Sequence, residues 1–212
     1  WNGADTGLKS YRLTIFDNLP RTGLPAEFKS YAEYQKHMQT LINAGVMEDT
    51  TKIWWDLRPS ARYPTLETRI MDVCTRMDDA ISLAALLVST IRMLYRLRLN
   101  NQRWREYNPM LIRENRWRAM RYSFDEGLID FGIGSIVPFK QLLDELIELT
   151  FEDAKSLGCE SEVAATKDIL NRGTSAHRQL KTYQLSMDAG QNHEDALKDV
   201  VDMLITETAA DL

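Results

Sequence analysis

With 212 residues, of which 44% are hydrophobic and 27% charged, the chain has the composition of an ordinary globular protein and is long enough to bury one core. Its longest segment without a charged residue, residues 80–91, is shorter than the ~18 apolar residues of a membrane span, so we expect no spanning helix and no membrane partner. The two cysteines lack C-x-x-C spacing and favour reduced thiols, so we expect a cytoplasmic protein.

The N-terminal part of the chain is expected to contain irregular backbone followed by a helix. Residues 1–27 hold two of the six prolines, so Arg12 would be presented by a loop rather than by a helix. In residues 30–44 apolar side chains recur at intervals of three and four, which predicts an amphipathic helix. Ser30 and Glu33 would form a capping box at its start.

Two short strands are predicted next. Side chains alternate along residues 53–58, and Pro59 then ends the strand because it lacks a ladder donor. In residues 65–70 the alternation places Glu67 and Arg69 on one face, while the other face would pack against the protein. Charges therefore occupy positions where core residues would be expected.

A carboxylate and a guanidinium two residues apart on one strand can serve a charged ligand. Oxygen ligands suit Mg²⁺ or Mn²⁺, and the planar guanidinium suits phosphate or carboxylate. The simpler alternative is a cross-strand salt bridge on a solvated sheet face. The spacing of Glu67 and Arg69 leaves both interpretations open.

The remainder of the chain is predicted to be helical, with one hairpin. A capping box of Thr75 and Asp78 would begin a long helix ending near Leu99; it is apolar nearly all round, so we expect it to pack beneath the sheet. Glycine-interrupted apolar pairs predict a hairpin over residues 128–137. Apolar periodicity and glycine punctuation predict further helices over residues 108–122, 139–157, 162–170, 175–188 and 192–207.

An arginine-rich segment stands out against the net charge of −5. Residues 92–121 contain nine arginines and no lysine, against two glutamates. Interleaved aromatic residues would suit a single-stranded nucleic acid. The preference for arginine also suits bidentate pairing within the protein or a phosphate site. All three interpretations stay open from the residues, although the acidic remainder of the chain leads us to expect no nucleic-acid partner.

Four motifs occur in a recognisable order. They are D-T-G at residues 5–7 followed by Ser10, Tyr11 and Arg12, W-W-D-L-R-P-S at residues 54–60, T-L-E-T-R-I-M-D at residues 65–72, and N-R-W-R-A-M-R-Y at residues 115–122. Together they resemble the signature of the type 2 glutamate–cysteine ligases, also called carboxylate-amine ligases. The resemblance runs from residue 1 to about residue 184.

The resemblance implies an α+β chain that is part of a glutamine-synthetase-like fold, with a few antiparallel strands and a predominantly helical C-terminal portion. Residues 1–75 would carry the substrate loop, a helix and the catalytic strands, and residues 76–212 would be the helical portion of the same domain. The implied enzyme uses ATP and Mg²⁺ (or Mn²⁺) to phosphorylate the γ-carboxylate of glutamate, and the amine of cysteine then attacks the γ-glutamyl phosphate.

The resemblance also implies roles for individual residues. Catalytic roles fall to Arg58 and Arg69, substrate binding to Arg12, Ser10 and Tyr11, nucleotide or phosphate binding to Arg58 and Ser60, and metal binding to Glu67. Attack on a phosphorylated carboxyl group needs its charge neutralised, which fixed cations and a metal can do without reorganisation.

The chain departs from the resembled family in two respects. Family members carry a further N-terminal half, so we expect this chain to be a fragment whose partner is that missing half and whose isolated activity is small or absent. Ser123 and Phe124 stand where the family usually has a glycine. A homo-oligomer stays open, and so does the alternative of a non-catalytic module that binds a nucleotide or an acidic ligand with the same residues.

Overall fold

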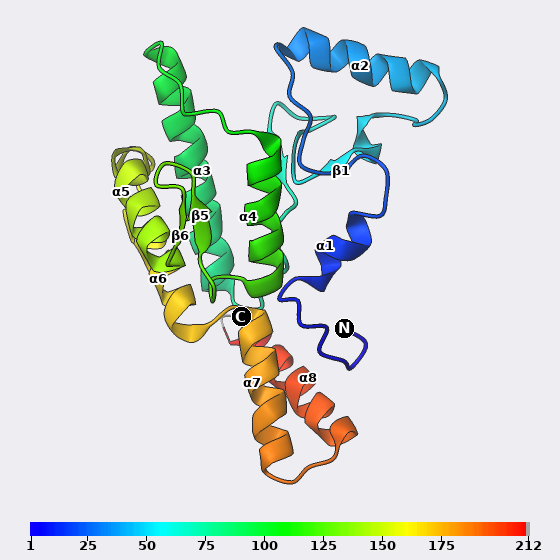
Figure 1. Ribbon diagram of the computed structural model, residues 1–212, viewed down its shortest axis with the longest axis vertical. Coiled ribbons are helices and arrows are strands. Elements are labelled where there is room, and N and C mark those ends of the chain that lie inside the picture. Colours follow the sequence, from blue (N-terminus) through cyan, green and yellow to red (C-terminus); the bar gives the residue numbers. More distant parts are fainter. Residues whose placement is uncertain (211–212) are drawn as a thin grey trace. The chain divides into compact units, whose positions relative to one another are not determined.

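The computed structural model describes residues 1–210, which form two compact units (Figure 1). We call Ser10–Asp72 the strand unit, and Trp1–Lys9 together with the chain from Val73 onward the helical unit. Helices dominate, and the strands of the described residues form three two-stranded sheets. The expected α+β class is confirmed. Two of the pairs are antiparallel, as expected, whereas β1 (Thr22–Gly23) and β2 (Trp54–Trp55) are parallel.

The strand unit contains two α-helices, a 3₁₀ turn and four short strands. In chain order they are α1 (Tyr11–Phe16), β1 (Thr22–Gly23), α2 (Tyr31–Asn43), η1 (Thr50–Lys52), β2 (Trp54–Trp55), β3 (Leu57–Pro59) and β4 (Leu66–Thr68). The expectation that Arg12 lies in a loop is wrong, because Arg12 belongs to α1. Helix α1 is short and buries only Leu13 among its residues. The proline content of residues 1–27 gave no indication of this helix.

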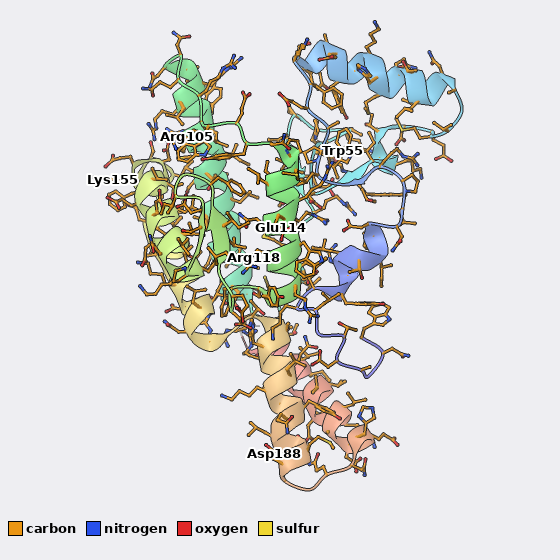
Figure 2. All side chains as sticks on the ribbon, in the orientation of Figure 1. Trp55, Arg105, Glu114, Arg118, Lys155 and Asp188 are labelled. Atoms are coloured by element: carbon orange, nitrogen blue, oxygen red, sulfur yellow. The ribbon has the colours of Figure 1, made fainter. Side chains whose placement is uncertain are left out.

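A small apolar cluster holds the strand unit together. Tyr34 and Met38 of α2 pack with Met47 and Ile53, and all four are buried. Trp55, labelled in Figure 2, is partly buried against this cluster, with its ring centroid 5.9 Å from that of Phe28. Burial of this apolar area anchors the helix to the strands.

The predicted start of α2 is confirmed, with one change in the cap. The hydroxyl of Ser30 accepts a hydrogen bond from the Glu33 amide at 3.1 Å, as a capping residue should. The Glu33 carboxylate accepts from the amide of Lys29 at 2.6 Å, one residue before the cap. The side chains of Ser30 and Glu33 therefore each accept a hydrogen bond from one backbone amide at the start of the helix.

The single strand predicted over residues 53–58 is divided at Asp56, and this division explains the sheet topology. The Asp56 amide donates to the carbonyl oxygen of Gly23 at 2.8 Å, and its own carbonyl oxygen accepts from the Arg69 amide at 2.8 Å. The backbone thus leaves β1 and joins β4 at this residue. The β3–β4 register then places Arg58 opposite Glu67.

The helical unit contains six helices within the described residues. Its elements are α3 (Met77–Leu99), α4 (Pro109–Tyr122), β5 (Leu128–Asp130), β6 (Ser135–Val137), α5 (Phe139–Leu157), α6 (Glu160–Arg172), α7 (Ser175–Asp188) and α8 (His193–Ala209). Figure 1 shows α3 packed with α5 and α6, and α7 beside α8. Ala85, Ala154 and Val163 form the buried centre of the three-helix group.

The predicted arginine-rich helix and hairpin are confirmed, and they are joined to each other. Asn108 caps α4 by accepting from the Met110 amide at 2.9 Å. The amide side chain of Asn115 donates to and accepts from the backbone of Ile129 in β5, each time at 2.8 Å. Arg118, labelled on α4 in Figure 2, donates to the carbonyl oxygen of Glu126 at 2.8 Å.

The long helix α3 differs from expectation at its start. Arg76 is its N-cap and gives no side-chain cap, and the predicted capping box of Thr75 and Asp78 is therefore wrong. The Thr75 hydroxyl donates instead to the Glu207 carboxylate at 2.6 Å. Thr75 thus bonds to Glu207, far along the chain, instead of to the first turn of α3.

Helix α3 is also long and apolar enough to cross a membrane when judged by length and composition alone. Our expectation of no spanning helix rested on the longest segment entirely free of charge, a criterion that does not detect α3, and the expectation stays a prediction. Core helices of soluble proteins satisfy the same criterion, and α3 packs against α5 and α6 within its unit.

Candidate functional site

Three charged side chains converge at the β3–β4 pair, and we call Arg58, Glu67 and Arg69 the arginine–glutamate cluster. Arg58 donates to Glu67 Oε2 from Nε at 3.0 Å and from Nη2 at 2.8 Å. Arg69 donates from Nη1 to Glu67 Oε1 at 2.6 Å. Each carboxylate oxygen is thus held by a guanidinium group: Oε2 by Arg58 in the middle of β3, and Oε1 by Arg69, the residue after β4.

The backbone before β3 holds Arg58 in place. Its Nη1 donates to the carbonyl oxygens of Thr51, at 2.9 Å, and of Ile53. Only 12% of the side chain is exposed. Because the guanidinium is planar and its donors have fixed directions, these bonds fix the orientation of the group that meets Glu67.

The outer part of the cluster is open to solvent. The exposed fraction of the side chain is 40% for Glu67 and 32% for Arg69. Hydrogen bonds from Arg58 hold the pKa of Glu67 below its ordinary value; burial opposes this effect but is outweighed, and Arg69 adds to the lowering. Glu67 is therefore a carboxylate at neutral pH, within reach of a ligand.

The cluster fits both interpretations of the sequence. The contact between Arg58 and Glu67 is the cross-strand salt bridge of the simpler one. Arg69 is nevertheless partly exposed, and its described side-chain hydrogen bond, to Glu67, uses Nη1. Its other donors can therefore also meet an anion.

The residues present supply part of a metal site and not a complete one. Within residues 1–210 no group of three or more histidine, cysteine, aspartate or glutamate side chains is placed to hold a metal ion. Mg²⁺ at phosphate sites is commonly held by one or two carboxylates together with phosphate oxygens and water. Glu67 is chemically suited to be one such ligand, but it would have to share its oxygens with Arg58 and Arg69.

Arg12 lies in the same unit and is engaged in structural contacts. It donates from Nε to the Asp72 carboxylate at 2.5 Å and from Nη2 to the carbonyl oxygens of Ile70, at 2.8 Å, and Met71, at 3.0 Å. These bonds connect α1 to the segment that follows β4. The resemblance gives Arg12 a role in substrate binding. In that role Arg12 would contact the substrate through Nη1, or the segment of residues 70–72 that it holds would contact the substrate.

The remaining predicted residues lie at two places in the strand unit. Ser60 closes the β3–β4 turn, where its hydroxyl accepts from the amides of Arg62, at 3.3 Å, and Tyr63, at 3.2 Å. Ser10 is the N-cap of α1, and its buried hydroxyl has no hydrogen-bond partner among the described residues. Tyr11 is the first residue of that helix. The structure thus brings Arg58, Glu67 and Arg69 into direct contact, and within residues 1–210 no described hydrogen bond or ion pair joins Ser10 or Ser60 to them.

A second charged cluster, in the helical unit, was not predicted from the sequence. Arg178 donates to the two carboxylate oxygens of Glu207 at 2.6 and 3.0 Å, and Arg172 donates to Asp79 at 2.5 Å. Burial would raise the pKa of Glu207, but hydrogen bonds from Arg178 and Thr75 outweigh it and lower the pKa. Thr75 and Glu207 are 132 residues apart, so no local spacing could have revealed this network.

The contacts of the arginine-rich segment are consistent with structural pairing. Arg96 donates from Nη2 to the buried Asp153 carboxylate at 2.7 Å, and Arg92 lies 3.8 Å from it. Arg121 donates to the carbonyl oxygen of Gly7 at 2.7 Å. Arginines from this segment thus tie α3 to α5 and α4 to the N-terminal residues of the helical unit.

Comparison with known proteins gives a consistent family. The model of the family described as glutamate-cysteine ligase family 2 matches residues 1–203. A protein of Rhodospirillum rubrum named "Putative glutamate–cysteine ligase 2" is 57% identical over all 212 residues, which cover 54% of its own length. Proteins of the same name from Jannaschia sp. and Ruegeria pomeroyi are 54% and 55% identical over the whole chain, which covers 56% and 54% of their lengths. The chain therefore spans about half the length of the curated relatives it matches.

Proposed function

Because the chain belongs to glutamate-cysteine ligase family 2, we propose that it forms part of an ATP-dependent carboxylate-amine ligase that joins the γ-carboxylate of glutamate to an amine such as that of cysteine. The observation that carries this proposal is the arginine–glutamate cluster, in which two guanidinium groups, that of Arg58 fixed by backbone carbonyl oxygens, hold a solvent-accessible carboxylate on a strand pair. Its three residues lie in the motifs at residues 54–60 and 65–72, which resemble the signature of the family.

The proposed reaction has two steps. A γ-carboxylate oxygen of glutamate attacks the terminal phosphorus of ATP, the bond to the bridging oxygen breaks, and ADP leaves. The amine nitrogen then attacks the acyl carbon of the γ-glutamyl phosphate, the bond from carbon to the phosphate oxygen breaks, and the amine gives up a proton. Phosphate and a γ-glutamyl amide are the products.

In this proposal the arginine–glutamate cluster contributes to catalysis by stabilising negative charge. The first step brings a carboxylate against the negative oxygens of ATP, and the second develops negative charge on the acyl oxygen and on the departing phosphate. Fixed cations in a partly desolvated site stabilise this charge. Arg69, at the exposed edge, is the group we propose for direct contact with phosphate. Arg58 is anchored by backbone carbonyl oxygens and would act mainly as a positioning residue that fixes Glu67.

ATP would bring Mg²⁺ or Mn²⁺, which neutralises phosphate charge when bound. Glu67 would be the ligand that this chain contributes, and further ligands would come from phosphate oxygens, water and the part of the protein outside this chain. Ser10, Tyr11 and Arg12 stay in the proposal as residues for the substrate amino acid, and Ser60 as a residue near phosphate. We also propose that the enzyme is cytoplasmic.

The activity belongs, in this proposal, to the full-length protein. A site assembled from two parts loses its geometry when one is absent, and a displacement of about 1 Å can cost on the order of 100-fold in rate. We therefore expect this chain alone to show little or no turnover.

The substrate dependence of ADP release tests the proposal. In the full-length protein, ADP should form at a sustained rate only when ATP, glutamate and an amine are all present, and it should appear with an equimolar γ-glutamyl product by mass spectrometry. A protein that binds ATP but forms no γ-glutamyl product with any of the amino acids tested as amine would instead fit a non-catalytic binding module.

A further inference from the structure

Helix α3 buries its less apolar face. The residues of α3 that are buried within the helical unit are Asp79, Ser82, Ala85, Ser89 and Met93. Ala85 packs with Ala154 and Val163 of the neighbouring helices. The Ser89 hydroxyl lies 3.6 Å from the thiol of Cys159. The most buried side of α3 thus combines small and polar side chains with Met93, and Leu86 packs beside it against the same cluster.

The opposite side of α3 carries a stripe of large apolar residues in solvent. We call this the α3 stripe; its exposed large members are Met77, Ile81, Val88, Tyr95 and Leu99. They are spaced by four or seven residues, so they lie along one side of the helix. Their exposed fractions lie between 47% and 64%. Ala84, also exposed, continues the stripe between Ile81 and Val88.

Three of the five charged residues of α3 pair with neighbouring helices, whereas Asp78 and Arg98 are exposed. Arg92 lies beside the stripe, four residues after Val88, and reaches Asp153 of α5 at 3.8 Å. Asp79 pairs with Arg172 of α6, and Arg96 pairs with Asp153 of α5. Both ion pairs are therefore directed to the packed side of the helix. An ordinary surface helix has the reverse arrangement, with its apolar face inward and its charges in water. A continuous exposed apolar surface of this kind marks an interaction site.

We propose that the α3 stripe is the surface on which the part of the full-length protein outside this chain packs. This inference rests on the proposed function, in which the chain is one part of a longer ligase. The relatives are about twice as long as this chain, so the additional polypeptide is comparable to it in size. A helix of 23 residues is about 34 Å long, a length that a strand pair or another helix of that polypeptide can cover.

The occupant matters because an apolar helix face can be covered in other ways. A second copy of the chain, the strand unit of the same chain, or a lipid surface would also remove the stripe from water. The polypeptide outside this chain is favoured because the relatives all possess it, and because packing of that part would complete the core on both sides of a helix that is apolar nearly all round.

Photo-crosslinking in the full-length protein tests the proposal. Tyr95 is replaced by the photoreactive amino acid p-benzoylphenylalanine, which keeps an aromatic ring, and the crosslinked peptides are identified by mass spectrometry. We expect crosslinks within the monomer to peptides that lie outside this chain. The same probe at Lys181 on α7, a polar exposed position, is the matched control and should give few crosslinks.

Four outcomes would overturn the proposal: crosslinks to residues 10–72, crosslinks between two copies, crosslinks to lipid, or none at all. Maleimide labelling of a Val88→Cys variant gives a second measurement if the probe at Tyr95 disturbs folding. The thiol should react at least tenfold more slowly in the native full-length protein than that of Lys181→Cys, and equal rates would contradict the inference. Neither readout uses ligase activity, so an inactive protein that crosslinks as expected would refute the proposed function alone.

Discussion

The ionisation of Glu67 is the most direct residue-level consequence of the cluster. Arg58 and Arg69 lower its pKa below the ordinary 4.5, so the folded state holds the carboxylate more strongly than the unfolded chain does. The resulting stability is present above about pH 4.5 and is lost as the pH falls through the lower, folded-state pKa. Urea unfolding of the full-length protein and of Glu67→Gln, measured over this range, should show a difference that shrinks as the pH falls. A constant difference would contradict the ion-pair account.

Arg12 offers a test between a structural and a substrate-binding role. Arg12→Lys keeps the charge but cannot reach Asp72 and two carbonyl oxygens in the same geometry. The structural contacts predict a loss of about 1–2 kcal/mol in the free energy of unfolding. The substrate-binding role that we propose predicts, in addition, a clear rise in the KM for glutamate, and an unchanged KM would refute that role. A large rise in that KM with unchanged stability would show that Arg12 holds substrate.

Ser123 is a residue in a conformation that suits glycine. It follows α4 with φ 55° and ψ −118°, a region that side chains with a Cβ rarely adopt. The resembled family usually has a glycine at this turn. Ser123→Gly should therefore raise the stability of the protein by about 1 kcal/mol in urea unfolding, and a destabilised variant would show that the serine makes a compensating contact.

At the scale of elements, the hairpin after α4 depends on the absence of a side chain at Gly127. A Cβ there would lie 2.1 Å from the carbonyl oxygen of Val137, whereas a Cβ at Gly134 would meet nothing within 4 Å. Both glycines have positive φ, so both substitutions carry the same kind of backbone cost. Gly134→Ala should cost about 1–2 kcal/mol and Gly127→Ala clearly more. Equal losses in thermal unfolding would refute the close approach.

Helices with local end signals could be predicted from the sequence almost residue by residue. The structure has α5 at Phe139–Leu157, ended by Gly158 in the left-handed conformation, and α7 at Ser175–Asp188, both as predicted. The strands could not be predicted so closely, because the break at Asp56 depends on two partners distant in sequence. The same distinction applies to Thr75, whose partner Glu207 replaced a local cap.

The candidate site shows the same limit. The opposition of Arg58 and Glu67 follows from the antiparallel pairing of two short strands that are joined by the loop of residues 60–65, so strand pairing makes it predictable. The backbone anchors of Arg58 and the engagement of Arg12 with Ile70 and Met71 arise from loops, which periodicity does not describe. Sequence patterns thus identified the charged residues of the cluster but not what holds them in place.

At the scale of the whole molecule, the chain supplies one wall of the proposed site. It spans about half the length of its relatives, and α3 presents the α3 stripe, a row of its large apolar residues, to solvent. The prediction that α3 packs beneath the sheet came from its apolar composition; within the described residues its main contacts are with α5 and α6, and one row of its large apolar residues stays exposed. In our proposal the rest of the ligase provides the second layer of the core and the remaining ligands of the metal.

The central claim is that the arginine–glutamate cluster serves catalysis, and the turnover of two matched variants of the full-length protein tests it most directly. Glu67→Gln removes the carboxylate held by Arg58 and Arg69, whereas Glu48→Gln removes an exposed carboxylate 3.3 Å from Lys52 in the same unit. With glutamate, an amine and ATP, we predict that kcat falls by about 10²–10³ in Glu67→Gln and changes by less than about twofold in Glu48→Gln, both folded by circular dichroism. A folded Glu67→Gln enzyme that turns over as fast as Glu48→Gln would contradict the account.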